Sequence, residues 1–281
     1  PMDLPMMRVD SHQHFWRYSP SDYPWIPQGS AIHRDYLPPD LKRELDDARI
    51  DACIAVQARQ EFKENRFLCG LAEQHEFIVG VVGWIDLRSE QVDEQAKQFR
   101  RLPKAVGVRH VVQDESDPDF MAKEPFRRGI KCLRDHQLVY DILIYAHQLK
   151  DAIRLVRDFP EQRFVLDHIA KPKIRSGDIQ EWRADIHSIA SYSNLYVKLS
   201  GMVTEADHQK WTEPQLRPYW QHILQTFGPD RILYGSDWPV IRLASEYSRW
   251  IEIVTHWLDE LGEADREKIW GGNTRLAYLS H

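Results

Sequence analysis

Cysteine is scarce in this chain. It has three cysteines, an odd number, and no two of them have the Cys-x-x-Cys spacing of redox and zinc motifs. This scarcity argues against a disulfide framework and favours a reducing compartment, where thiols pack as small apolar side chains. We therefore expect a cytoplasmic protein.

Long apolar runs and basic clusters are missing as well. No apolar run reaches the roughly 18 residues of a membrane span, and the first residues lack the basic-then-apolar pattern of a signal peptide. Lysine and arginine are interspersed with acidic residues, and the net charge is -6. This charge distribution argues against nucleic acids and membrane surfaces as partners, because both are bound through clustered cations.

The chain does contain a regular alternation of strand and helix patterns over its 281 residues. Each unit has about 30 to 35 residues, which predicts a single (β/α)8 TIM barrel, with residues 1–281 as one domain. A doubly wound open sheet also alternates, but no glycine-rich phosphate-binding turn follows the first strand. The predicted strands cover residues 7–14, 51–56, 77–85, 105–112, 138–146, 163–167, 195–199 and 231–234.

The first predicted strand ends in His12-Gln13-His14. Alternation along a strand places both histidines on one face, roughly 7 Å apart, where two imidazoles can hold one metal ion or polarise one oxygen. Considered alone, the same pattern also fits two surface histidines at the end of a strand. The position of the other polar residues decides between these interpretations.

Polar side chains gather at the carboxyl ends of the predicted strands, the edge that forms the active site of a TIM barrel. They are His12, His14, Arg109, His147, His168 and Asp237. Imidazoles and a carboxylate together form a typical divalent-metal site, with zinc the first choice. Asp237 is suited to take a proton from water, although it also fits a turn before Trp238-Pro239.

These motifs resemble the amidohydrolase superfamily over essentially the whole chain. The closing segment 270–276 resembles its metal-dependent hydrolase branch, known as amidohydrolase-2. Segments 10–16, 22–25, 107–115 and 167–172 resemble the sugar-lactonase group within that branch. Many superfamily members hold two metals bridged by a carboxylated lysine or a glutamate on strand four or five, and this sequence offers no such residue there. We therefore expect one divalent metal at most, and some lactonases of this group work without any.

The resemblance implies hydrolysis of a sugar lactone to the aldonic acid, with L-fucono-1,5-lactone as the first candidate substrate. His12, His14, His147 and Asp237 would hold the ion, while Asp237 acts as general base. His168 and Arg109 would contact the carbonyl or the oxyanion. The expected substrate contacts are Trp16, Tyr18 and Trp25 for stacking, and Gln57, Arg59 and Lys171 for hydroxyl groups. Core packing is an equally good account of each aromatic, and a surface role is nearly as good for Lys171.

Three alternatives stay open at this point. A decarboxylase of the same superfamily uses a similar set of histidines and one aspartate, but it needs more cations for a carboxylate substrate. A lactonase of aromatic degradation fits the same motifs. A catalytically inactive barrel that binds a sugar is the alternative from a different class. The sequence predicts no oligomeric state.

Overall fold

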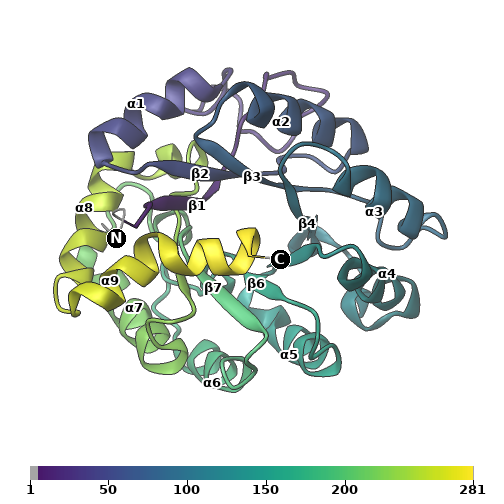
Figure 1. Cartoon of the computed structure of the whole chain (residues 1–281). Helices are drawn as coiled ribbons and strands as arrows, with labels where there is room; N and C mark the ends of the chain where they lie inside the picture. Colours follow the sequence, from purple (N-terminus) through teal and green to yellow (C-terminus); the bar gives the residue numbers. More distant parts are fainter. Residues whose placement is uncertain (1–5, 281) are drawn as a thin grey trace, which may run out of the picture.

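The computed structural model describes residues 6–280, and it confirms the predicted (β/α)8 barrel (Figure 1). Eight parallel strands form one sheet in which each strand pairs with the next along the chain. A parallel bridge between Gln13 of the first strand and Trp238, four residues after the last strand, closes the barrel. The strands are β1 Val9–Gln13, β2 Ala52–Val56, β3 Ile78–Gly83, β4 Ala105–Val111, β5 Val139–Leu143, β6 Phe164–Leu166, β7 Leu195–Leu199 and β8 Ile232–Tyr234.

Helices follow the strands and form the outer ring of the barrel (Figure 1). They are α1 Pro38–Ala48, α2 Phe62–Gln74, α3 Val92–Arg100, α4 Glu124–Asp135, α5 Leu149–Asp158, α6 Gln180–Ile189, α7 Glu213–Phe227, α8 Tyr247–Leu258 and α9 Glu263–Glu267. Two short π-helical segments, Lys268–Gly272 and Arg275–Leu279, continue from α9. No helix among residues 6–280 is long and apolar enough to cross a membrane.

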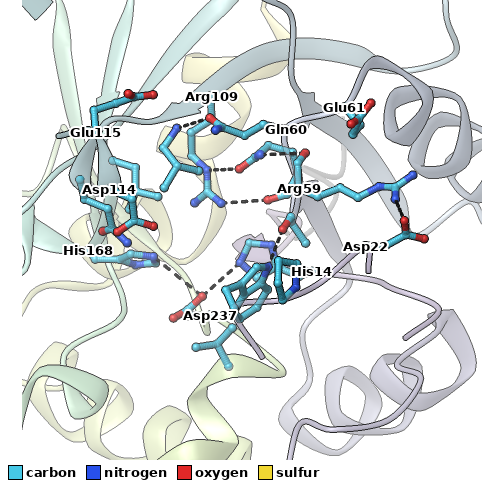
Figure 2. Close-up of a pocket in the computed structure, with 18 of the residues that line it drawn as sticks. His14, Asp22, Arg59, Gln60, Glu61, Arg109, Asp114, Glu115, His168 and Asp237 are labelled. Carbon is cyan, nitrogen blue, oxygen red and sulfur yellow. Dashed lines mark hydrogen bonds and ion pairs between the residues drawn. The ribbon is translucent and has the colours of Figure 1, made fainter. Parts of the chain in front are cut away.

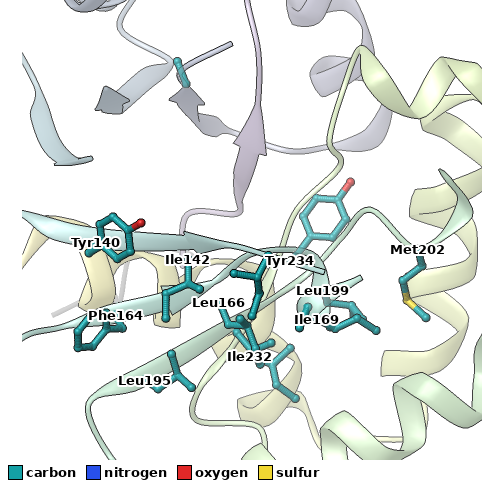
Figure 3. Close-up of a cluster of buried hydrophobic side chains, with 14 of the residues drawn as sticks. Tyr140, Ile142, Phe164, Leu166, Ile169, Leu195, Leu199, Met202, Ile232 and Tyr234 are labelled. Carbon is teal, nitrogen blue, oxygen red and sulfur yellow. The ribbon is translucent and has the colours of Figure 1, made fainter. Parts of the chain in front are cut away.

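Side chains on the outer face of the strands form the main core against the helices. Tyr140 and Ile142 of β5 lie beside Phe164 and Leu166 of β6, and the series continues through β7 and β8 (Figure 3). Their alternation with inward-facing residues follows from the two-residue period of a strand. Burial of such side chains stabilises the fold by roughly 1.5–3 kcal/mol each.

The interior of the barrel changes from apolar to polar along its axis. One end is filled by a second cluster that includes Val9, Val139, Val165 and Leu233, together with Tyr278 from the last π-helical segment. Towards the carboxyl ends of the strands, the buried side chains are Asp141, Asp167, Lys198 and His12. Charged side chains are buried only where they are paired, because an unpaired buried charge is very costly. This layer lies towards the carboxyl ends of the strands, where the active site of a TIM barrel is found.

A register irregularity in β1 turns its histidines inward. The pairing between β1 and β2 shifts between Asp10 and Gln13. Asp10 bonds Tyr247 of α8, and Gln13 donates to the Cys53 sulfur, so both face the helical ring. His12 therefore points to the barrel axis, as Val9 does. Because these residues are three positions apart, they would lie on opposite faces of a regular strand.

Candidate active site

Three histidines surround one carboxylate oxygen at the mouth of the barrel, and Figure 2 shows two of them, His14 and His168, beside Asp237. Asp237 Oδ1 lies 3.3 Å from His14 Nε2, 3.6 Å from His12 Nε2 and 3.8 Å from His168 Nε2. The two Nε2 atoms of His12 and His14 are 3.2 Å apart. The prediction that both histidines share one face is thus confirmed, and the segment after β8 supplies the aspartate opposite them.

Backbone hydrogen bonds between the first strand and the segment after β8 place this aspartate. The Asp237 amide donates to the His12 carbonyl at 2.8 Å, and the His14 amide donates to the Trp238 carbonyl at 2.8 Å. Asp237 itself has φ 59, a left-handed conformation that is uncommon for a residue with a side chain. The hydrogen bonds that join the first strand to the segment after β8 therefore also fix the position of the Asp237 carboxylate.

His168 stands on a left-handed turn directly after β6. Its φ is 55, and Ile169, Ala170 and Lys171 also have positive φ values between 46 and 63. Such a conformation costs roughly 1–2 kcal/mol per residue, so surrounding contacts must hold it. The Trp182 indole of α6 donates to the Ile169 carbonyl at 2.7 Å, and the Lys171 amide donates to the His168 carbonyl at 2.8 Å.

Burial keeps two of the imidazoles neutral and the aspartate is ionised. Desolvation holds the pKa of His12 well below its usual value, with the Lys198 charge acting in the same direction. Desolvation also holds the pKa of His168 well below the usual value, although Asp237 opposes this shift. Burial alone would raise the pKa of Asp237, but His168, His14 and Lys171 outweigh it and lower that pKa. At neutral pH the neutral imidazoles of His12 and His168 therefore lie beside a carboxylate base.

A layer of buried charges supports the cluster from below. Lys198 Nζ lies 2.6 Å from Asp141 Oδ2, 3.3 Å from Asp167 Oδ1 and 3.2 Å from His12 Nδ1. Asp167 Oδ2 accepts from Arg109 Nη1 at 3.0 Å. These pairs compensate charges that would otherwise be very costly to bury.

Arg109 is held almost entirely by other residues. Its Nε donates to Gln57 Oε1 at 2.8 Å and its Nη2 to the Gln57 carbonyl at 2.8 Å, while Nη1 contacts Asp167 and His12. A guanidinium has five N–H groups, so these four contacts leave one N–H on Nη2 free to meet a ligand. The residue lines the pocket with only 5% of its surface exposed.

The hydrogen bonding of His14 indicates that the cluster suits a bound cation. Its Nδ1 lies 2.9 Å from the Val56 carbonyl oxygen and must donate, because a carbonyl only accepts. In the neutral ring Nε2 then carries a lone pair, yet it faces another acceptor, Asp237 Oδ1. A proton or a metal ion between them resolves this. Ligand atoms of His12, His168 and Asp237 also lie within 4.8 Å of one another, as divalent-metal ligands do.

The cluster opens into a pocket of about 580 Å³ above the barrel. His14, Arg109, His168 and Asp237 form its floor (Figure 2). Polar residues line its wall, and they are Ser21, Asp22, Gln57, Arg59, Gln60, Glu61, Gln113, Asp114, Glu115 and Lys171. Trp25, which is 42% exposed, covers part of the rim and donates through its indole to the Ala58 carbonyl at 2.8 Å. The size and the many polar groups suit a small polyhydroxylated ligand.

Three predicted site residues are not brought to this pocket. β5 ends at Leu143, three residues earlier than predicted, and the chain turns outward so that Leu149 can begin α5. His147 therefore lies in the 3-10 turn Ala146–Gln148, exposed and stacked on Tyr145, and does not complete the predicted metal set. Trp16 is fully buried against Tyr36, and Tyr18 packs on His33; neither lines the pocket.

The charged layer beneath the histidines was not predicted from the sequence. Asp141 and Lys198 stand in the middle of otherwise apolar strands, and Asp167 directly precedes His168. A charged residue inside an apolar strand could have predicted this layer, because such a residue is almost never buried without a partner. The sequence carries no comparable signal for Ser200, whose hydroxyl lies 2.8 Å from His168 Nδ1.

Comparison with known proteins agrees with this arrangement. A sequence model of the amidohydrolase family matches residues 9–278. The chain belongs to the amidohydrolase family. The resemblance expected from the His-x-His, histidine and aspartate motifs is thereby confirmed.

Similar family members include proteins named L-fucono-1,5-lactonase. One from Burkholderia multivorans is 39% identical over 97% of this chain and 96% of its own length. Another, from Burkholderia ambifaria, is 34% identical over 95% of this chain and 93% of its own length. The crystal structure of an amidohydrolase from Burkholderia multivorans with bound zinc superposes with a TM-score of 0.94 at 38% identity, covering 98% of this chain and all of the other.

Proposed function

We propose that this protein hydrolyses a sugar lactone to the corresponding aldonic acid, with L-fucono-1,5-lactone as the preferred candidate. The observation that carries the proposal is the ionised Asp237, surrounded by three imidazoles on the floor of a polar pocket. The names of the two Burkholderia relatives support the lactone as substrate class.

Asp237 acts as the base in the proposed reaction. Its lowered pKa keeps it ionised at neutral pH, and it takes one proton from the attacking water as the oxygen bonds to the lactone carbon. The ring C–O bond then breaks, and Asp237 returns the proton to the departing oxygen. The product is one hydroxy acid, which ionises and releases a proton to solvent.

The carbonyl oxygen is polarised by groups on the opposite side of the pocket floor. Arg109 lines the cavity and retains one N–H that can donate to the carbonyl oxygen. The Ser200 hydroxyl can donate to His168 Nδ1, which leaves a proton on Nε2 for the developing oxyanion. Where a divalent ion is bound, we propose zinc held by His12, His14, His168 and Asp237, supplying Lewis-acid polarisation of the carbonyl.

The polar wall would hold the hydroxyl groups of the sugar. Arg59 is fixed by Asp22 at 2.6 Å, and Gln57 donates to the Arg59 carbonyl at 3.1 Å. Lys171 lies 3.9 Å from Glu205 and reaches the same cavity. Trp25 offers an aromatic face at the rim for the C–H face of the ring.

The test is a pH-indicator assay over a panel of sugar 1,4- and 1,5-lactones, with wild type and Asp237→Asn. We expect acid release with one sugar series and a loss of kcat of about 10²- to 10⁴-fold in the variant, because proton transfer to the base is removed. Asp47→Asn is the matched control, since it makes the same chemical change at an exposed position of α1 outside the pocket and should leave kcat unchanged.

The same assay tests the metal. Activity lost with a chelator and restored by zinc would support the ion, whereas unchanged activity would assign carbonyl polarisation to His168 and Arg109 alone. Wild-type kcat in a folded Asp237→Asn variant would refute the mechanism. Silence across the whole panel would refute the substrate class.

A further inference from the structure

A second group of metal-ligating side chains lies on the outside of the barrel, in the ring of helices. Asp93 stands in the first turn of α3, while Cys132 lies in α4 and His136 caps its carboxyl end. Helices α3 and α4 are neighbours in this ring (Figure 1). The three residues have no part in the proposed lactone chemistry.

The backbone fixes the positions of the two α4 ligands. Cys132 and His136 are four residues apart, so their side chains lie on one face of the helix. The His136 amide still bonds the carbonyls of Arg134 and Leu133, which keeps its backbone in line with the helix. Asp93 faces this pair from α3, and the two helices thus present a carboxylate, a thiol and an imidazole to one point.

The distances between the ligand atoms suit one small ion. One ligand atom from each residue lies within 4.8 Å of the other two. Cys132 Sγ is 3.6 Å from Asp93 Oδ1, and tetrahedral zinc places a sulfur and an oxygen ligand about 3.6 Å apart. His136 Nε2 is hydrogen-bonded to Asp93 Oδ1 at 2.7 Å, so this pair must open by ~0.7 Å to admit the ion.

We infer that Asp93, Cys132 and His136 form a second, surface zinc site that links α3 to α4. A thiolate with an imidazole selects zinc over magnesium or calcium, which prefer oxygen ligands. The Asp93 side chain is 77% exposed, which leaves room for the carboxylate to move and for water to take the fourth position. The charges that face the cluster are Lys97 from α3 and Asp135 from α4.

Binding at this site releases a proton. Burial and the neighbouring Asp93 raise the pKa of the Cys132 thiol to about 11, so it is protonated in the metal-free protein. The S–H bond breaks as the S–Zn bond forms, and the proton goes to the buffer.

Cobalt(II) distinguishes this site from the barrel mouth, because a cobalt–thiolate bond gives a charge-transfer band in the near ultraviolet. The proposed barrel ligands include no cysteine, and Cys53 and Cys69 are buried. The experiment titrates cobalt(II) into full-length protein from which metals have been removed, in degassed buffer. We expect the band in wild type, its complete loss in Cys132→Ser, and at least tenfold weaker binding in His136→Ala.

Cys69→Ala is the matched control, since it removes a buried thiol far from α4 and should keep the band. Competition with zinc should abolish the band in wild type. Zinc should also raise the Tm of wild type more than that of Cys132→Ser, and the difference isolates this site from any ion in the barrel. Absence of the band in folded wild type, or its survival in Cys132→Ser, would overturn the inference.

Lactone hydrolysis by Cys132→Ser should equal that of wild type. The inference and the proposed function therefore fail separately: the cobalt band does not depend on turnover, and turnover does not depend on Cys132.

Discussion

Lys198 is fully buried between two carboxylates and one imidazole. Its ammonium lies within 3.3 Å of Asp141, Asp167 and His12. Replacing it with methionine keeps the aliphatic stem but leaves Asp141 without its cation. We expect Lys198→Met to lower the free energy of unfolding by about 3–5 kcal/mol, the usual cost of breaking a buried ion pair from one side.

Urea unfolding at neutral pH measures this cost. Lys210→Met is the matched control, because Lys210 is exposed and the same change there should alter the unfolding free energy by less than about 0.5 kcal/mol. A Lys198→Met protein as stable as the control would mean that Asp141 is protonated in the native state and needs no cation.

Glu64 is a buried carboxyl group that ties the segment after β2 to α2. Its Oε2 accepts from the amides of Ala58 and Arg59, each at 3.0 Å, and its Oε1 faces the Tyr23 hydroxyl. Burial raises its pKa to about 7, against the opposing effect of those amides. The folded protein therefore holds a proton on Glu64 between about pH 4.5 and 7 that the unfolded chain has lost.

Because only the folded protein binds this proton between about pH 4.5 and 7, the free energy of unfolding falls as pH rises towards 7. Over that interval the linked loss is about 3 kcal/mol. Glu64→Gln keeps an oxygen for both amides and presents an NH₂ group to Tyr23, but it does not titrate. We expect the variant to gain stability relative to wild type as pH rises from 5 to 8. Urea unfolding of both proteins at each pH tests this, and parallel pH profiles would contradict it.

At the scale of single elements, the left-handed turn that carries His168 has a strained backbone conformation within the site. Gly201, just after β7, packs against it with φ +66, and an added Cβ would lie 2.5 Å from His168 Cγ. Gly201→Ala must therefore adopt a strained backbone and also displace the His168 ring. We expect a loss of about 2–4 kcal/mol in unfolding free energy and a clear fall in kcat.

Gly177 provides the comparison that separates strain from displacement. It also has positive φ, +73, but an added Cβ there would meet nothing within 4 Å. Gly177→Ala should cost only the backbone strain, about 1–2 kcal/mol, and leave kcat unchanged. Equal effects of both substitutions on kcat would show that His168 is not positioned by Gly201.

At this scale the sequence predicted the strands well but not their last residues. Apolar runs such as Ala52–Val56 have one clear interpretation, because a parallel strand is buried on both faces. The end of β5 was placed too late, since Ile144 is apolar although it lies beyond the strand. The left-handed turn was not predicted, because Ile169 and Ala170 have no preference for positive φ and only their tertiary contacts hold them.

At the scale of the whole molecule, the repeat of strand and helix was enough to predict the barrel, and the barrel then predicted where Asp237 and the first histidines meet. The pairing of charges inside the barrel was not predictable in the same way. Which strand residues share one layer depends on register, and register here includes the irregularity in β1. His147 illustrates the limit, since a histidine after a strand has the same appearance whether it points inward or outward.

The closed end of the barrel depends on the last π-helical segment, which crosses the barrel opening in yellow in Figure 1. Tyr278 fills the apolar end of the interior and donates to Asp141 Oδ1 at 2.6 Å, while Arg163 holds the carbonyls of Leu276 and Ala277. Deleting the chain from Arg275 onward would expose this cluster to water and leave Asp141 with one partner fewer. We expect a large fall in Tm and binding of a hydrophobic dye to the native protein.

Tyr278→Phe separates the two contributions of this segment. It keeps the apolar plug and removes only the hydrogen bond, so it should cost about 1–3 kcal/mol in unfolding free energy and bind no dye. Thermal unfolding and dye fluorescence of both variants provide the measurement. If the deletion were no more damaging than Tyr278→Phe, the segment would act through Asp141 alone, and the barrel would not need it as a cover.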